Sequence, residues 1–360
     1  MQSTKNTLTR RHFLKQVTPF AGALFIPGLA SGLLQTDGKG GLTTRGVVVS
    51  VDDLKTLNWP KLAKQAGLTT IGTHVNPTQV AAFIATAQGQ TFLEDCRKYN
   101  IQVEHELHAM QELLPRSYFD KNPEMYRMNE HGVRVNDYNC CPHSEQALAI
   151  IAENAVRYAE KLTPTTMRFF YWIDDLKPMC KCKLCRELND ADQALLIENA
   201  IIKALKQKYP SASLAHLAYG NTMTPPALVK PEKGIFLEFA PVFRQWDKPL
   251  SNGQAGYHTT KGIMPTHAKT LEWLYENLKV FPAETAQVLE YWLDVSLQSS
   301  YKKPARKVLW YPDICKKDID IYRNAGIKNI TTFAVYVDGA YQKQYNDLDF
   351  INEYGKILKN

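Results

Sequence analysis

Short apolar runs alternate with amphipathic stretches along most of the chain, and this pattern predicts strands and helices in turn. Eight runs rich in β-branched and aromatic residues predict strands at 47–52, 70–75, 101–108, 168–174, 213–219, 234–240, 286–294 and 330–338. Apolar residues at helical spacing predict helices at 60–67, 79–99, 144–162, 190–209, 266–281, 313–325 and 348–358. Helices or long loops therefore separate the strands.

This order is typical of an α/β protein with a parallel sheet. Eight strand–helix units in one domain favour a TIM (β/α)8 barrel over a doubly wound sheet. We expect the barrel to occupy residues 46–360, with a long loop at 113–142 after the third strand and a cysteine-rich loop after the fourth. The first strand is not followed by a glycine-rich phosphate-binding sequence, so we expect no nucleotide cofactor.

The first 32 residues carry the pattern of an export signal. The sequence TRRHFLK at 9–15 resembles a twin-arginine signal, and an apolar run and small residues follow it. We interpret 1–32 as this signal peptide and 33–45 as a linker; the alternative is a basic amphipathic helix of the mature protein. We therefore expect the Tat translocase as a partner and a location in the periplasm or cell envelope. No later apolar run is long enough to cross a bilayer, so we expect no stable membrane anchor.

Charge and composition fit an ordinary globular protein. The net charge is +7, and four basic residues before position 33 account for four of these charges, which leaves +3 for the rest. This balance argues against a nucleic-acid-binding protein. Hydrophobic residues make up 44% of the chain and charged residues 22%, as is typical of a folded domain with a sizeable core.

Acidic and aromatic residues recur where the predicted strands end, which is where TIM barrels carry their active sites. The carboxylates that we select as catalytic candidates are Asp174, Asp175, Glu238 and Glu290. The candidates for sugar binding are Trp172, Trp292, His74, Tyr219 and His105. Asp294 and His108 also fall at strand ends. Paired carboxylates among aromatic faces suit glycoside hydrolysis, in which one acid protonates the leaving oxygen and a second carboxylate attacks or activates water.

A family resemblance points the same way. Residues 121–132, KNPEMYRMNEHG, together with the acid-ended strand and the Cys-x-Cys-x-x-Cys sequence after it, resemble the bacterial glycosidase-like barrels catalogued as domain of unknown function 4838. The resemblance covers most of the chain after the leader. That family is similar to α-glucuronidase and hexosaminidase barrels and is thought to act on carbohydrates. It implies Asp175 as the general acid and Glu238 or Glu290 as the second carboxylate; Asp174 departs from the family's Asn-Asp pair.

Each acidic candidate also has a structural interpretation. The Asp174–Asp175 pair could cap the following turn, and Glu238 or Glu290 could pair with a buried arginine such as Arg244. We interpret the chain as an exported glycoside hydrolase that takes a glycan or oligosaccharide. The alternatives are a non-catalytic glycan-binding barrel and a metal or redox protein centred on the cysteines. The distance between the carboxylates, which separates retaining from inverting enzymes, remains open.

Five of the seven cysteines fall in two loops that a barrel would bring together. Cys140 and Cys141 end the loop after the third strand, and Cys180, Cys182 and Cys185 follow the fourth. Three sulfurs from the second loop and one from the first could hold a structural zinc ion. Disulfides are the main alternative, because the periplasm is oxidising, and an iron–sulfur centre or free thiols are the others.

Overall fold

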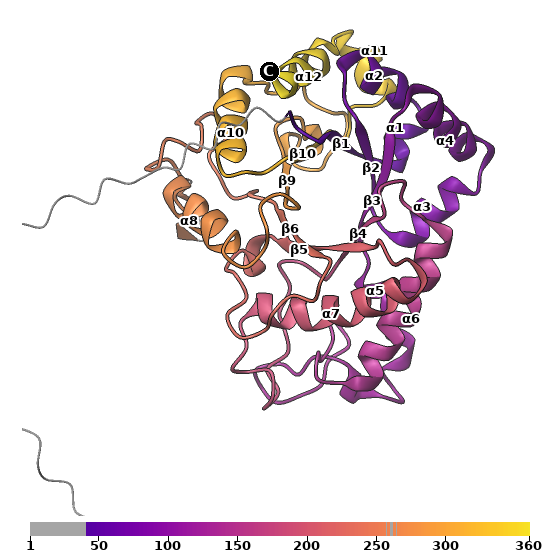
Figure 1. The fold of residues 1–360 in the computed structure, drawn as a ribbon, viewed down its shortest axis with the longest axis vertical. Helices are drawn as coiled ribbons and strands as arrows, with labels where there is room; N and C mark the ends of the chain where they lie inside the picture. The colour runs from indigo at the N-terminus through magenta and orange to yellow at the C-terminus, as the bar shows by residue number, and fades with distance from the viewer. Residues whose placement is uncertain (1–40, 257, 260–261, 264) are drawn as a thin grey trace, which may run out of the picture. The chain divides into compact units, whose positions relative to one another are not determined.

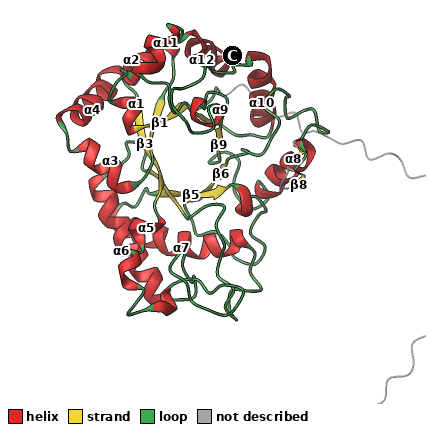
Figure 2. Ribbon diagram, turned by 180° about the vertical axis from the view of Figure 1, so that it is seen from behind, coloured by secondary structure: helices red, strands yellow, loops and turns green. Residues whose placement is uncertain are grey.

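Eight parallel strands close into a barrel in the order β1-β10-β9-β6-β5-β4-β3-β2. The computed structural model describes residues 41–256, 258–259, 262–263 and 265–360; the predicted signal peptide lies outside them. Helices surround the ring of strands (Figure 1), and the view from behind shows the same ring (Figure 2). The predicted (β/α)8 barrel is therefore confirmed.

All eight barrel strands coincide with predicted strands. They are β1 (Thr44–Ser50), β2 (Thr70–His74), β3 (Gln102–His108), β4 (Arg168–Trp172), β5 (Ser213–Ala218), β6 (Ile235–Phe239), β9 (Gln287–Glu290) and β10 (Asn329–Phe333). An antiparallel pair outside the barrel joins β7 (His258–Thr259) to β8 (Gly262–Ile263). β1, β4, β9 and β10 end two to five residues before the predicted limits. β1 passes directly into α1, and the other three pass into loops.

The helices follow the predicted order, with several short additions. They are α1 (Val51–Leu54), α2 (Trp59–Ala66), α3 (Pro77–Ile84), α4 (Ala87–Tyr99), α5 (Met110–Leu113), α6 (Glu145–Lys161), α7 (Asp190–Lys208), α8 (His267–Asn277), α9 (Val295–Gln298), α10 (Pro312–Asn324), α11 (Gly339–Tyr345) and α12 (Asp349–Lys359). None of these helices combines the length and the apolar character that crossing a membrane requires.

The helix predicted at 79–99 is two helices, α3 and α4. The Thr86 hydroxyl donates to the Phe83 carbonyl (2.7 Å) and accepts the Gly89 N–H (3.1 Å), so it ends one helix and begins the next. The turn is tight, because a Cβ at Gly89 would lie 2.1 Å from the Phe83 carbonyl oxygen. The hydrophobic periodicity continues across this break, which explains why the sequence pattern reads as a single helix.

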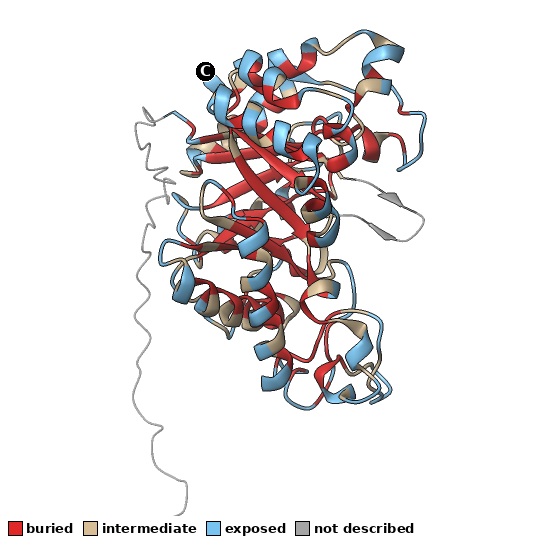
Figure 3. Cartoon of the chain, turned by 90° about the vertical axis from the view of Figure 1, so that its right-hand side faces the viewer, coloured by how far each residue is buried: buried red, intermediate tan, exposed pale blue. Residues whose placement is uncertain are grey.

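The barrel strands are buried on both faces (Figure 3), as their nearly continuous apolar runs predict. The helices cover the outer face of the strands. Inside the barrel, apolar side chains such as Val48, Phe170 and Leu289 form a cluster that reaches the carboxyl ends of the strands.

A polar group lies within this interior. Gln287 Nε2 donates to Glu106 (3.3 Å) and to Glu238 (3.4 Å), while its Oε1 accepts from Arg168 (2.9 Å). Arg168 also lies 3.3 Å from Glu104. Burial raises the pKa of Glu238 to about 8 and that of Glu106 well above its usual range, so neither is fully ionised at neutral pH. These groups support the floor of the site described next.

Candidate active site

A cavity of about 350 Å³, here called the rim cavity, opens at the carboxyl end of the barrel. Side chains from the ends of β1, β2, β3, β4, β5, β9 and β10, or from the loops that follow them, line it. In a TIM barrel this end carries the catalytic groups. The predicted residues His74, Trp172, Asp175 and Tyr219 all line the rim cavity.

Two carboxylates enter the rim cavity from the fourth and seventh strands of the barrel. Asp175 follows β4, and its Oδ1 lies 3.0 Å from His108 Nδ1. Asp294 follows β9 and begins α9, where its Oδ1 accepts the Ser296 hydroxyl (2.6 Å) and the Leu297 N–H (3.1 Å). Asp294 is 4% exposed, and burial raises its pKa.

Three tyrosines lie near both carboxylates. Burial raises the pKa of Tyr219, Tyr291 and Tyr301, and the charges of Asp175 and Asp294 raise all three further. All three line the rim cavity. The two carboxylates therefore face one space across a set of hydroxyl groups and aromatic rings, and Asp52 adds a third carboxylate at the edge.

One wall of the rim cavity consists of rings that meet edge to face or at a tilt. His74 lies 5.1 Å from His108 and 5.6 Å from Trp172, measured between ring centroids. Burial lowers the pKa of His74 to about 3, so its ring is neutral. His74 Nδ1 bonds to the Glu106 carbonyl (2.7 Å); since a carbonyl only accepts, Nδ1 carries the proton and Nε2 is left as an acceptor.

Glu238 lies beneath this wall and does not line the rim cavity. Its Oε2 accepts the Trp172 indole N–H (2.7 Å), and the residue is fully buried. The bond fixes the orientation of the Trp172 ring. Glu238 thus supports the rim cavity through Trp172 without lining it.

Glu290 points away from the rim cavity. Its Oε1 accepts from Arg244 Nη1 (2.9 Å) and from the Tyr322 hydroxyl (2.5 Å), and Arg244 Nη2 also bonds to Asp318 (2.7 Å). All of these side chains are buried. The pairing with Arg244 considered in the sequence analysis is therefore present, and Trp292 joins it through its indole N–H to Asp318 (3.3 Å).

His105 and Asp174 also lie outside the lining of the rim cavity. His105 Nδ1 bonds to the Thr73 hydroxyl (2.7 Å), and burial lowers the pKa of His105 to about 4. Asp174 Oδ2 accepts from Arg116 (2.7 Å) and from the Asn139 N–H (2.9 Å). Asp174 thus ties the end of β4 to the loop after β3 instead of entering the rim cavity.

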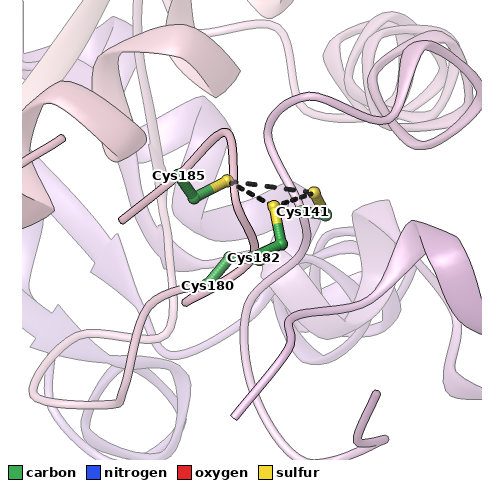
Figure 4. A group of neighbouring side chains, drawn as sticks. All are labelled: Cys141, Cys180, Cys182 and Cys185. Atoms are coloured by element: carbon green, nitrogen blue, oxygen red, sulfur yellow. Dashed lines mark hydrogen bonds between the residues drawn. The ribbon is translucent and has the colours of Figure 1, made fainter. Parts of the chain in front are cut away.

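Four cysteines from these two loops gather at one point (Figure 4): Cys141, Cys180, Cys182 and Cys185. Their sulfurs lie within 4.8 Å of one another, and three of the separations are 3.4, 3.8 and 3.9 Å. A tetrahedron of sulfurs about 2.3 Å from a zinc ion has edges of about 3.8 Å. The cluster therefore has the composition and dimensions of a four-thiolate metal site.

The surroundings of the cluster suit thiolates. Cys180 Sγ accepts the Met128 N–H (3.3 Å) and lies 3.7 Å from Arg134 Nη1, while His143 Nδ1 lies 3.2 Å from Cys185 Sγ. Donors and a cation next to sulfur stabilise negative charge. A buried group of four neutral thiols would not need these partners.

Cys140 is not part of the cluster. It is fully buried in the main apolar core, and burial raises the pKa of its thiol. Of the two candidates for the fourth ligand, the structure brings Cys141 to the other three sulfurs. Cys96 and Cys315 are buried elsewhere.

Sequence reasoning passed over Asp294 in favour of Glu290, four residues earlier. The available signal was strand alternation. Leu289 and Tyr291 line the rim cavity, so Glu290 between them must face outward, whereas Asp294 follows in the rim loop. The sequence showed that His108 ends a strand. Its pairing with Asp175 could not be predicted, because Asp175 follows a different strand.

Comparison with known proteins gives a family and a fold. The family model described as "Domain of unknown function (DUF4838)" matches residues 55–284. A cold-adapted β-galactosidase from Rahnella sp. R3 superposes with a TM-score of 0.53 at 10% identity, over 88% of this chain and 56% of that one. This chain thus spans little more than half of that enzyme.

Two further solved structures are similar at lower scores. An endoglucanase catalytic domain from Thermobifida fusca gives a TM-score of 0.42 at 12% identity, over 82% of this chain and 79% of that one. A psychrophilic family 10 xylanase gives 0.42 at 9% identity, over 86% and 96%. None of the curated proteins matches the chain. The likeness to the β-galactosidase, at 10% identity, supports the barrel fold alone.

Proposed function

The chain belongs to the DUF4838 family, and from the chemistry of the rim cavity we propose that it is a glycoside hydrolase with Asp175 and Asp294 as its paired carboxylates. The observation that carries this proposal is the entry of two carboxylates, from the fourth and seventh barrel strands, into one aromatic cavity. Neither Glu238 nor Glu290 lines that cavity. The β-galactosidase likeness is consistent with a glycan substrate.

The two carboxylates have different surroundings, which suggests their roles. Burial raises the pKa of Asp294, and this favours its protonated form. Asp175 lies beside His108, whose ring can donate a hydrogen bond to an ionised carboxylate. We therefore assign proton donation to the leaving oxygen to Asp294. Asp175 is the second carboxylate, which attacks the sugar or activates water.

Leaving-group dependence tests these roles. Asp294→Asn should lose roughly a hundredfold or more in kcat/KM for glycosides with poor leaving groups and far less for activated aryl glycosides, which need no protonation. Asp175→Asn should lose roughly a thousandfold or more for both kinds of substrate. Asp120→Asn, an exposed aspartate remote from the rim cavity lining, is the matched control.

The opposite pattern would exchange the two roles. If neither variant changed the rates, the assignment would be refuted. If the wild-type protein bound oligosaccharides but turned over none of a broad panel, the barrel would be a glycan-binding protein without turnover.

For the cysteine cluster the proposal is a structural zinc ion held by Cys141, Cys180, Cys182 and Cys185. Four thiolates close the coordination sphere, so the ion would brace two loops and take no part in the reaction. The cluster is separate from the rim cavity lining, which also counts against a redox centre acting on the substrate there. One zinc per chain in colourless purified protein would support this proposal; a visible iron–sulfur absorption band would overturn it.

We also propose that residues 1–32 direct export through the twin-arginine pathway to the periplasm or cell envelope. Cytoplasmic folding before export would let the thiols meet zinc before they reach an oxidising compartment. The test is fractionation of a bacterial host that expresses the full chain. Replacing both Arg10 and Arg11 with lysine should leave the protein in the cytoplasm, whereas the Lys5→Arg control should still be exported.

A further inference from the structure

A second cavity, here called the side cavity, adjoins the rim cavity and has a volume of about 510 Å³. It lies among the loop after β6, the end of β9 with α9, and the segment that begins α10. These elements also follow the carboxyl ends of barrel strands. The side cavity is therefore on the same face of the barrel as the carboxylates.

The two cavities share a wall. Tyr291 lines both, and Leu297 of the side cavity follows Ser296 of the rim cavity directly in the chain. The Tyr291 ring lies 5.7 Å from Trp246, in the side cavity, and 5.3 Å from Phe333, in the rim cavity. The short helix α9 begins at Asp294 in one cavity and ends at Gln298 in the other. The two cavities are therefore neighbours on one face of the barrel, with the Tyr291 side chain between them.

The lining of the side cavity suits a sugar ring. Aromatic rings come from Trp246, Trp292 and Tyr311, and amide side chains from Gln245 and Gln298. Aromatic faces cover the apolar face of a sugar, while amides donate to and accept from its hydroxyl groups. A few polar groups on a mainly apolar wall are typical of small-molecule sites.

The charges in both cavities point to the kind of sugar. Among the described residues that line them there is neither lysine nor arginine, whereas Asp52, Asp175, Asp294 and Asp247 contribute carboxylates. Arg244, below the side cavity, is fully buried and already paired with two carboxylates.

One cation near the rim cavity, Lys303, is engaged by other groups. Lys303 lies 4.8 Å from the centre of the Tyr336 ring at the edge of the rim cavity, and Asp338 accepts its hydrogen bond at 2.5 Å. A uronic acid would therefore meet carboxylates, with neither lysine nor arginine among the described lining residues to pair with it, at a cost that a neutral sugar avoids.

We propose that the two cavities are adjoining subsites for a neutral oligosaccharide of at least two rings. One ring lies at the carboxylates and the next in the side cavity. This inference rests on the proposed function, because it takes the rim cavity as the place of bond cleavage. It adds the length and the charge class of the substrate.

The test compares a one-ring substrate with a longer one. A neutral aryl monosaccharide glycoside would be measured beside the trisaccharide of the same sugar, with wild-type protein and the Tyr311→Ala variant. Tyr311 is 39% exposed, so the variant should fold. The variant should lower kcat/KM at least about tenfold more for the trisaccharide than for the aryl glycoside. Tyr275→Ala, at a 47% exposed tyrosine on α8 outside both cavities, is the matched control.

Equal effects of Tyr311→Ala on both substrates, or none on either, would overturn the second subsite. Trigalacturonic acid processed as well as the neutral trisaccharides would overturn the charge class.

Calorimetric binding of cello-, xylo- and chitotriose separates this inference from the proposed function. If no glycoside is hydrolysed but a neutral trisaccharide binds and Tyr311→Ala weakens it at least about tenfold, the subsites stand and the hydrolase assignment fails. Equal trisaccharide affinity of the wild-type protein and Tyr311→Ala would refute the second subsite, whether or not the protein hydrolyses glycosides.

Discussion

Replacing Cys141 with serine should release the proposed zinc ion and separate two loops. Cys141 is the cluster's contribution from the loop after β3, while Cys180, Cys182 and Cys185 come from the loop after β4. Without the Cys141 sulfur, the three remaining thiolates belong to one loop, so a metal ion bound to them would no longer join the two segments.

The loss of folding stability in Cys141→Ser can be estimated. Apart from the sulfurs, the backbone joins these loops next to the cluster through the bond from Lys181 N–H to the Met128 carbonyl (2.8 Å). Zinc present at a thousandfold excess over its dissociation constant stabilises the fold by ~4 kcal/mol. At about 2 °C per kcal/mol for a chain of this size, the variant should melt roughly 8 °C lower.

Cys140→Ser is the matched control, because Cys140 is the adjacent residue in the chain, is buried, and lies outside the cluster. It should keep one zinc per chain and lose only about 1–2 kcal/mol for a hydroxyl buried in place of the thiol. Metal content would be measured by plasma mass spectrometry, and melting by calorimetry with and without a chelator.

Two results would refute this reasoning. One is a full equivalent of zinc in Cys141→Ser. The other is wild-type protein, prepared with zinc in the medium, that contains no metal and whose cluster cysteines appear as disulfides by mass spectrometry of unreduced peptides.

Three further predictions concern one half-buried carboxylate, Asp174, and two buried ones, Glu290 and Glu238. Asp174→Asn, which removes the charge paired with Arg116, should lower the melting temperature by a few degrees and reduce kcat while the metal content stays unchanged. Glu290→Gln should cost about 3 kcal/mol in urea unfolding, because its buried arginine partner loses one of two counter-charges. The pKa of Glu238 is about 8 in the folded protein and near 4.5 unfolded; between these values the folded state holds the extra proton, so stability falls as pH rises. Glu238→Gln, whose amide oxygen can still accept from Trp172, should flatten that decline in urea titrations from pH 5 to 8.

The fold could be predicted from the sequence because the strands of a barrel are buried on both faces. Runs such as residues 235–239 are apolar except for Glu238, and the amphipathic stretches between them have helical spacing. The division of residues 79–99 into α3 and α4 could not be read from periodicity, because a single hydroxyl cap at Thr86 makes it.

The site was harder to predict, because function depends on the direction in which neighbouring side chains point. Glu290 and Tyr291 are adjacent, yet one bonds to Arg244 outside the barrel and the other lines the rim cavity. Cys140 and Cys141 differ in the same way. The sequence alone makes both members of each pair equally good candidates for the site. Which of the two side chains reaches it depends on the register of the strand or loop.

Asp174 and Asp175 have different roles, which the sequence could not distinguish: Asp174 holds the loop after β3, and Asp175 lines the rim cavity. Asp174 is bonded to Asn139, whose N–H reaches its Oδ2 at 2.9 Å and whose Oδ1 accepts the Asp174 N–H at 3.0 Å. Asn139 lies two residues before Cys141, and Asp175 is the next residue after Asp174. The cysteine cluster and the proposed catalytic carboxylate are therefore joined by three backbone steps and one pair of hydrogen bonds. Displacing a catalytic group by about 1 Å can lower the rate roughly a hundredfold. Loss of the proposed metal should therefore lower kcat by shifting Asn139 and, with it, Asp175, although none of the described cysteines lines the rim cavity.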